Sequence, residues 1–375
     1  MFSSPSLPVS YVGDHTRGFC DSRSRAERGD AVDLGSVWIL GVSLALTVLV
    51  YRPVLFHPFV YEDSNWWQYA FGAHEATSRW LPGLALTRDF WVANPMVMHL
   101  ESLWVHLLNG LLVFALAVSL RWPLPGAVAG LFLLHPLNSE AVSYASALSQ
   151  VVWTFWALLA VVAYLRGWWG VMLAGLVEAQ RTNPVGLSSI GLVLLAWWWY
   201  GKASKVQVLR SVGAGILLSV GLILFAQGQF NANDANPVSW WTWWSWEATA
   251  TYQMIGKFFV PLSLSVDHGV ELTSTLVRWL MLLAFVFTAS GPFIAGWRGD
   301  RSPKYFAAAW VVLTIVPRFA LRMPKSILTE HHFYPAMVGM SLLVTWYLSK
   351  IGSRSYVDSS NGAVLHGGDH RRGER

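Results

Sequence analysis

Long apolar runs recur along nearly the whole chain, and they constrain its fold more than any other feature. Several are too short to cross a bilayer as upright helices, so these would tilt or lie behind others. The chain is 54% hydrophobic and 13% charged, with 23 Trp, which is rare for soluble globular domains. We therefore predict an all-α, polytopic membrane protein with about ten or eleven transmembrane helices. The runs are residues 37–51, 96–120, 124–134, 151–165, 168–177, 186–200, 206–226, 276–294, 306–320 and 333–348.

The positions of Lys and Arg predict how these helices are oriented. If residues 1–34 are cytoplasmic and the runs alternate in direction, most of the 26 basic residues fall on the cytoplasmic side. Membrane topology then explains the net charge of +5 better than nucleic-acid binding does. The polar residues 1–34 and 351–375 are predicted to be disordered cytoplasmic tails around a transmembrane domain of residues 35–350. The polar beginning of the chain also argues against a cleaved signal peptide.

Two long segments, 56–95 and 227–275, fall on the outer side and are predicted not to cross the membrane. The first mixes acids, arginines and tryptophans, as do helices that lie in a membrane interface. Residues 248–262 are apolar enough to cross, but counting them as a span would move the basic residues of 298–304 outside. We therefore expect a re-entrant or interfacial segment there. An interfacial aromatic belt is favoured over a sugar-binding platform for Trp240, Trp241, Trp243, Trp244 and Trp246.

Glu140 is the only acid between Glu101 and Glu178, and it follows an apolar hairpin that turns at the outer surface. A carboxylate is costly at such a place, so a functional role is its default interpretation. The structural alternative is an acid that completes a helix N-terminal cap with Asn138 or Ser139.

With this topology, the charged residues near the helix ends converge on the outer face. Such a set suits a reaction in which one substrate is an anionic lipid and the acceptor hydroxyl needs a general base. Arginine and lysine would neutralise a leaving phosphate. The candidate catalytic residues are Asp63, Glu62 and Glu140, and the candidate binding residues are Arg88, His135, Glu178, Arg181, Arg318, Arg322, Lys325, Glu330 and His331.

Each candidate also has a simpler explanation. Adjacent acids in a polar loop are usually solvated, and outer arginines often bind lipid headgroups. His135 precedes Pro136 and would then cap a helix end. His106 and Asn109 lie one turn apart on an apolar run, where an interhelical hydrogen-bond pair is expected.

Six short motifs occur in an order that resembles a known family, the membrane O-mannosyltransferases that carry tetratricopeptide repeats. More distantly, the chain resembles the protein O-mannosyltransferases and the bacterial aminoarabinose transferases of the GT-C type. The resemblance covers about residues 56–348. The motifs are FVYED (59–63), HLLN (106–109), LLHPLNSEAV (133–142), LVEAQRTNP (176–184), FFVPLSLSVDH (258–268) and TEHHFYPAMVG (329–339).

This resemblance implies an inverting GT-C glycosyltransferase in a bacterial inner membrane, with its active face in the periplasm. The donor would be a polyprenyl-phosphate sugar, and the acceptor a protein or glycan. The family's acidic pair corresponds to Glu62 and Asp63, with Asp63 the preferred base, and its later acids correspond to Glu140, Glu178 and Glu330. A carrier with one phosphate requires no metal, so no cofactor is predicted.

Two other interpretations remain. The first is a non-catalytic protein of the same fold that binds a lipid-linked sugar or a partner. It is motivated by four positions at which the family usually has a charged residue and this chain does not keep it: Ser149, Gln150, Val177 and His331. The second is a transporter, which ranks last because Glu247 falls outside the predicted spans.

Overall fold

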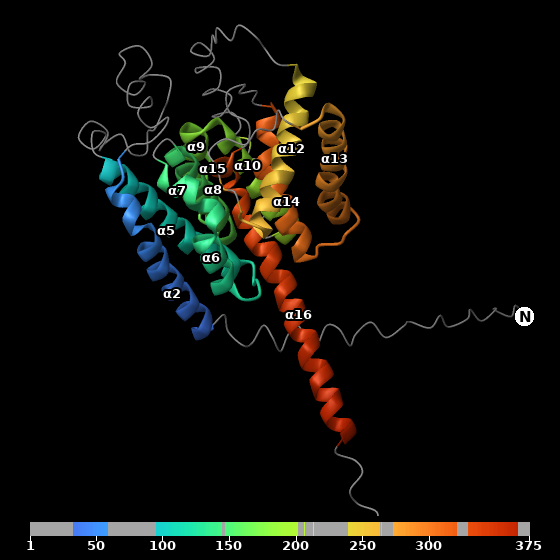
Figure 1. Cartoon of the computed structure of the whole chain (residues 1–375). Coiled ribbons are helices and arrows are strands. Elements are labelled where there is room, and N and C mark those ends of the chain that lie inside the picture. The colour runs from blue at the N-terminus through green and yellow to red at the C-terminus, as the bar shows by residue number, and fades with distance from the viewer. Residues whose placement is uncertain are drawn as a thin grey trace, which may run out of the picture.

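The computed structural model describes residues 33–58, 95–144, 147–201, 206, 213, 239–262, 264, 273–320 and 329–366, with side chains of the last segment described up to Ile351. These residues form helices joined by turns, and no strand occurs among them (Figure 1). The α-helices are α2 (Leu34–Tyr51), α5 (Pro95–Ser119), α6 (Pro125–Leu134), α7 (Ser139–Ser143), α8 (Leu148–Arg166), α9 (Trp169–Thr182), α10 (Ser188–Tyr200), α12 (Trp240–Phe259), α13 (Thr275–Trp297), α14 (Pro303–Ala320), α15 (Glu330–Phe333) and α16 (Ala336–His366). The 3-10 helices are η2 (Arg52–Phe56), η3 (Pro136–Asn138) and η5 (Pro184–Leu187).

Four helices in the described part of the chain are long and apolar enough to cross a bilayer. Three shorter apolar helices, Pro125–Leu134, Pro184–Tyr200 and Ala336–Ile351, accompany them. The predicted all-helical fold with membrane-type helices is therefore confirmed at this level. The four long helices are Leu34–Phe56, Pro95–Ser119, Leu148–Arg166 and Thr275–Trp297.

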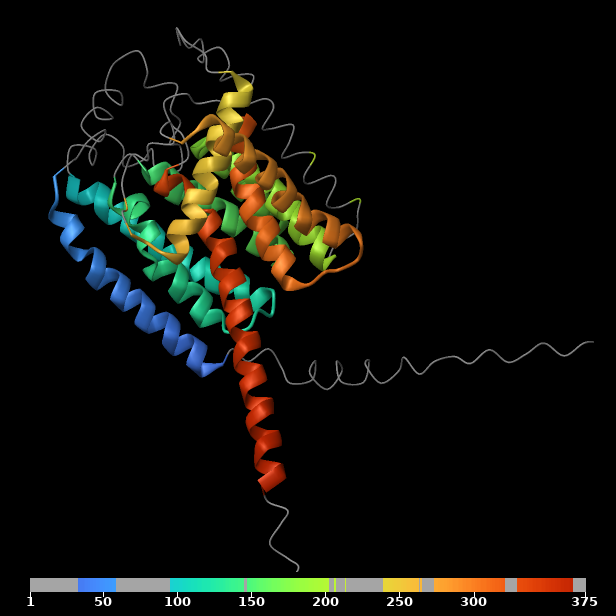
Figure 2. The same ribbon diagram turned by 45° about the vertical axis from the view of Figure 1, so that its right-hand side comes forward.

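The two ends of the helical bundle are formed by different segments of the chain. In Figures 1 and 2 the start of α2 and the turn between α5 and α6 lie at the lower end, whereas α7, α9 and α15 lie in the upper half. Helix α2 begins after Asp33, whose carboxylate accepts hydrogen bonds from the N–H groups of Gly35 and Ser36, each at 3.1 Å. The short segments that hold most described site candidates are thus gathered away from the start of α2.

Helices α12 and α13 run side by side in the same direction. Their rings meet near the helix starts, where the centroids of Trp241 and Trp279 are 6.3 Å apart. About three turns later, the Tyr252 hydroxyl lies 2.8 Å from Thr288 Oγ1. These two contacts show that α12 and α13 are parallel. The re-entrant or interfacial placement of residues 248–262 stays a prediction.

Helix α12 begins earlier than that predicted segment. The Ser239 hydroxyl accepts a hydrogen bond from the Thr242 N–H at 3.2 Å and caps the helix, so the Trp-rich stretch forms its first two turns. As a result Glu247, which the sequence places outside the spans, lies fully buried within a helix.

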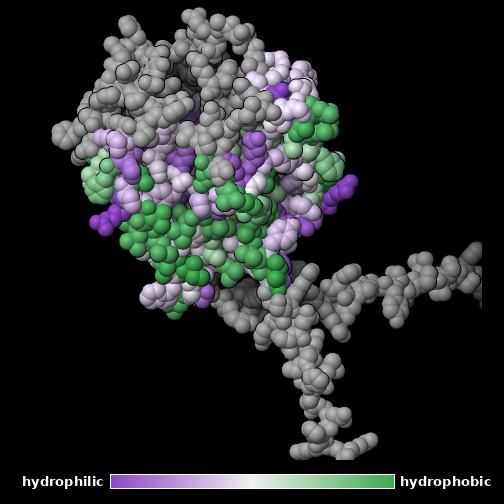
Figure 3. All heavy atoms as spheres, in the orientation of Figure 1, coloured by the Kyte–Doolittle hydropathy of each residue, from purple (hydrophilic) through white to green (hydrophobic). Residues whose placement is uncertain are grey.

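The interior is close-packed, while much of the outside is apolar. Trp153, Trp310 and Phe132 are almost completely buried, whereas Phe287 and Trp297 of α13 are 81% and 85% exposed. Figure 3 shows a broad hydrophobic patch across one face of the bundle. Exposed apolar surface of this extent is typical of helices that face lipid.

Helix α16 begins within the bundle and extends well beyond its lower end (Figures 1 and 2). It continues to His366, although the sequence predicts a disordered tail from residue 351. The physical reason is cooperativity: once a helix is nucleated and held by packing, each further residue adds a backbone hydrogen bond at little cost.

Candidate functional site

The turn that carries Glu140 is shaped by its own sequence. Helix α6 ends at Leu134 because the residue before a proline, here His135, disfavours helical geometry. The His135 Nδ1 atom accepts a hydrogen bond from the Leu137 N–H at 3.2 Å, and the Asn138 amide donates to the Phe132 carbonyl at 2.6 Å. These bonds orient α7, with Glu140 in its first turn.

The Glu140 carboxylate extends to α15 and contacts His331 twice. Its Oε2 atom accepts a hydrogen bond from the His331 backbone N–H at 2.9 Å, and its Oε1 atom lies 2.7 Å from His331 Nδ1. Glu140 therefore joins two helices separated by 191 residues in the sequence. This contact replaces the N-terminal cap that the sequence offered as the structural explanation of Glu140.

A second ion pair lies beside the first. Glu330, adjacent to His331 on α15, binds Lys257 of α12, with 3.1 Å between Glu330 Oε1 and Lys257 Nζ. The Glu330 side chain is 2% exposed and that of Lys257 16%. We call Glu140, Lys257, Glu330 and His331 the junction cluster, because three helices meet there. The structure thus brings together three of the predicted site residues and adds Lys257.

His135 borders the junction cluster, with both ring nitrogens engaged. Nε2 lies 2.9 Å from the Phe258 carbonyl, and the two rings stack with centroids 4.4 Å apart. Because Nδ1 accepts from Leu137, the proton must lie on Nε2, which fixes one neutral tautomer. Burial lowers the pKa of His135, and the hydrogen bond to Phe258 opposes this only in part. The helix-capping role, the simpler explanation of His135, is the one observed.

Tyr334 follows α15 and connects the cluster to the bundle core. Its hydroxyl lies 2.7 Å from His106 Nδ1 and accepts a hydrogen bond from the Asn109 amide at 3.0 Å. The Asn109 amide also donates to the Val151 carbonyl, and His106 Nε2 lies 3.1 Å from the Leu133 carbonyl. The predicted interhelical bonding of His106 and Asn109 is confirmed, with Tyr334 as their shared partner.

Arg318 lies in α14 and is only 3% exposed. Its Nε atom lies 3.4 Å from Oε2 of Glu247, which is fully buried on α12. The residue was predicted to hold a substrate phosphate. In the structure its guanidinium group already faces a carboxylate, so an incoming phosphate would have to share or replace that partner.

Glu178 and Arg181 pair with each other near the end of α9. The Arg181 Nη1 atom donates to Glu178 Oε1 at 2.9 Å, and their side chains are 21% and 30% exposed for Glu178 and Arg181 respectively. The spacing of three residues on one helix accounts for the contact. Nearby, the Asn183 amide lies 3.4 Å from Ser149 Oγ and links the end of α9 to α8. Gln150, at a position that lacks the family's charge, accepts a hydrogen bond from Trp153 Nε1 at 2.8 Å.

The remaining candidates, Glu62, Asp63, Arg88, Arg322 and Lys325, lie outside the described residues. Within the described ranges, no group of three or more His, Cys, Asp or Glu side chains could hold a metal ion.

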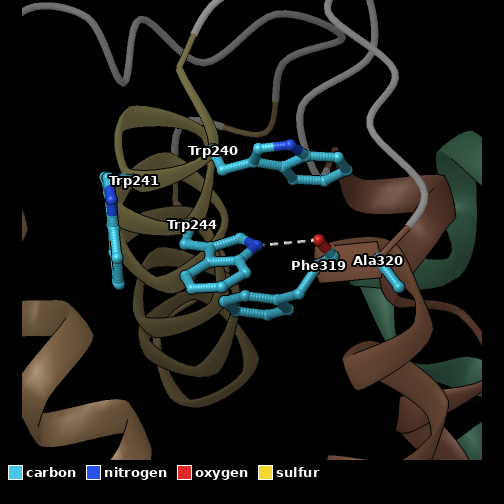
Figure 4. A pocket seen from close by; sticks show the side chains of 5 residues that line it. All are labelled: Trp240, Trp241, Trp244, Phe319 and Ala320. Carbon is cyan, nitrogen blue, oxygen red and sulfur yellow. Dashed lines mark hydrogen bonds between the residues drawn. The ribbon is translucent and has the colours of Figure 1, made fainter.

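A groove of about 490 Å³ lies between α12 and α14, lined by Trp240, Trp241, Trp244, Phe319 and Ala320 (Figure 4). The Trp244 Nε1 atom donates to the Phe319 carbonyl at 2.9 Å, and Trp243 Nε1 donates to the Arg318 carbonyl at 3.2 Å. The indoles thus donate hydrogen bonds to carbonyls in the last turn of α14 and connect α12 to that end of the helix. Trp240 and Trp241 are 46% and 58% exposed, and both of their rings contact the Trp244 ring.

Sequence reasoning missed Lys257, Glu247 and Tyr334 as partners of the site. Lys257 gave no signal beyond its place near the outer face, and its pairing depends on the docking of α12 onto α15. Tyr334 carried a usable signal, because a buried tyrosine hydroxyl needs a polar partner and the apolar run 96–120 contains His106 and Asn109.

Comparison of the chain with protein-family models, with curated proteins and with solved structures gives no match.

Proposed function

We propose that this protein is a membrane glycosyltransferase that moves a sugar from a polyprenyl-phosphate carrier to a protein or glycan acceptor. The observation that carries the proposal is the contact between Glu140 and His331, at 2.7 Å between Oε1 and Nδ1. A carboxylate paired with an imidazole can accept and stabilise a proton released by an attacking hydroxyl group.

The surroundings of this pair support a lipid-linked donor. The junction cluster is built on a bundle whose outer surface is largely apolar, and four of its helices have the length of membrane spans. A donor with a long prenyl chain would partition into the surrounding bilayer and present its phosphate and sugar at the membrane surface. We propose the periplasmic face of a bacterial inner membrane, or an equivalent luminal face, as that surface.

The motif order supports the same class of reaction. Glu140 and His331 belong to two of the six motifs that resemble the GT-C transferases, and Lys257 directly precedes a third. The proposal includes a GT-C topology of ten or eleven spans. It also keeps Glu62, Asp63 and Arg88 as participants from the first outer loop.

One observation favours a second candidate function, a non-catalytic protein that binds a lipid-linked sugar. Each described acid of the predicted site already faces a basic partner: Glu140 faces His331, Glu178 faces Arg181 and Glu330 faces Lys257. Such pairing is typical of structural ion pairs as well as of active sites.

Turnover separates the two functions. The purified protein, in lipid nanodiscs, is mixed with radiolabelled polyprenyl-phosphate sugars and a periplasmic protein extract, and sugar transfer is measured with release of the polyprenyl phosphate. We expect transfer by the natural protein and a much lower rate of transfer in Glu140→Gln. The matched control is Asp300→Asn, an acid-to-amide change in the turn between α13 and α14 that preserves the acceptor for the Ser302 N–H. Saturable donor binding without turnover would support the second function instead.

A further inference from the structure

Both oxygen atoms of the Glu140 carboxylate contact the same residue, His331. Oε2 accepts from the backbone N–H of His331 at 2.9 Å, and Oε1 lies 2.7 Å from Nδ1 of the same residue. The Glu140 side chain is 7% exposed, against 16% for His331. Glu140 therefore lies behind the imidazole and contacts a substrate less readily than His331 does.

The hydrogen-bond pattern also defines the state of the His331 ring. An ionised carboxylate only accepts hydrogen bonds, so the hydrogen between Glu140 and His331 lies on Nδ1. In the neutral ring the lone pair is then on Nε2. Thr329 Oγ1 lies 3.0 Å from Nδ1 and 3.5 Å from Nε2, a distance at the outer limit of hydrogen bonding. The basic nitrogen of His331 is thus the one that points away from Glu140.

Charged and ionisable groups surround the His331 ring. Glu140 contributes a carboxylate in direct contact, and Glu330 is compensated by Lys257 at 3.1 Å. Within the part of the chain that the structure describes, the His331 ring also faces His332, with ring centroids 4.0 Å apart, and Tyr144, at 6.2 Å. His332 Nδ1 accepts a hydrogen bond from the Thr329 N–H at 3.2 Å.

We infer that His331 is the general base of the reaction, and that Glu140 is a positioning residue. The inference rests on the proposed function. The acceptor oxygen forms a bond to the anomeric carbon of the sugar while the bond from that carbon to the carrier phosphate breaks, and the electron pair leaves with the phosphate. The acceptor proton moves to His331 Nε2, forming an imidazolium ion that the Glu140 carboxylate stabilises. The proton is then released to water.

Two substitutions of His331 distinguish a residue that accepts a proton from one that only supplies positive charge. Glutamine has neither a basic nitrogen nor a charge, and arginine is permanently charged and cannot accept a proton. If His331 accepts the proton, both His331→Gln and His331→Arg lower kcat about 100-fold or more, the usual contribution of general base catalysis. If residue 331 only supplies positive charge to the phosphate, His331→Arg stays active and the inference is wrong.

Chemical rescue and pH profiles complete the test. Imidazole added to His331→Ala should restore transfer in proportion to its neutral form, while Asp300→Asn shows the natural rate without imidazole. Glu140→Gln should lower kcat with little change in KM, because it leaves the imidazole in place but removes the carboxylate that orients it. If Asp63 is the base, the acidic limb of the kcat/KM profile persists in His331→Gln and imidazole has no effect, which overturns the inference. A natural protein that transfers no sugar overturns the proposed function itself.

Discussion

Glu247 of α12 and Arg318 of α14 face each other with 3.4 Å between Oε2 and Nε, and their side chains are 0% and 4% exposed, respectively. Ionised groups this deep in an apolar bundle are costly, because neither retains its water shell. The pair holds the start of α12 against the end of α14, where Trp243 and Trp244 bind the Arg318 and Phe319 carbonyls. Charge pairing and indole hydrogen bonds together hold the start of α12 against α14.

Breaking this pair on one side should destabilise the protein more than removing both partners. Glu247→Leu or Arg318→Met leaves one buried charge without compensation, which costs about 3–5 kcal/mol. The double variant replaces both with apolar groups of similar volume and should recover most of that loss. Thermal unfolding in detergent, followed by fluorescence-detected size exclusion, gives the order of the three variants. Additive losses in the double variant would show that the residues do not interact.

The Tyr334 hydroxyl should contribute to stability through its two buried partners. Tyr334→Phe removes the group shared by His106 and Asn109 and leaves His106 Nδ1 without its partner at 2.7 Å. We expect a loss of about 1–3 kcal/mol, the usual cost of an unsatisfied buried polar atom. Tyr347→Phe is the matched control, because Tyr347 is 50% exposed. Equal unfolding temperatures for the two variants would contradict this network.

His135 should make stability depend on pH. Burial lowers its pKa below the ordinary value of 6.5, so on acidification the unfolded chain binds a proton before the folded protein does. The contribution of His135 is therefore complete above about pH 6.5 and falls as the pH drops towards the folded pKa, by at most about 1.4 kcal/mol per pH unit. His135→Asn keeps an acceptor for the Leu137 N–H and does not titrate. The stability difference between natural protein and variant should shrink below pH 6.5, and a constant difference would exclude this role.

Apolar runs predicted the positions of the long helices well. A helix that packs in a bundle or faces lipid needs a run of apolar residues, and such a run is visible in the sequence alone. The runs 96–120, 151–165 and 276–294 correspond closely to α5, α8 and α13. Residues 240–259 were predicted only as an interfacial or re-entrant segment, and the structure forms one 20-residue helix there. The beginning of this helix was not predicted, because a Trp-rich stretch is equally compatible with a belt at the membrane surface and with helical turns capped by Ser239.

Partners within the site were the least predictable part. The sequence placed Glu140 and His331 on one face, but not in contact, since their pairing depends on how α7 and α15 dock across 191 residues of chain. Arg318 was predicted to bind a phosphate because it lies among the charged residues at the outer face, and its pairing with Glu247 depends on how α12 packs against α14. Once α12 is helical from Trp240, Glu247 lies about two turns inside it and reaches Arg318.

Gly339 should be essential for the close approach of α14 and α16. A Cβ atom at this position would lie 2.7 Å from the Ala307 carbonyl oxygen and 2.7 Å from Val311 Cγ2, so the helices would have to separate. Small residues allow such close packing between apolar helices. Gly339→Ala should therefore destabilise the protein by about 1–3 kcal/mol, as overpacking usually does.

Gly256 of α12 provides the opposite case within the same protein. A Cβ atom there meets nothing within 4 Å, and alanine is a better helix former than glycine by about 1 kcal/mol. Gly256→Ala should leave the unfolding temperature unchanged or raise it, while Gly339→Ala lowers it. Because both substitutions add one methyl group to a helix, a difference between them reports contact with α14 alone. If the two variants unfold together, α14 and α16 do not pack as closely as the structure shows.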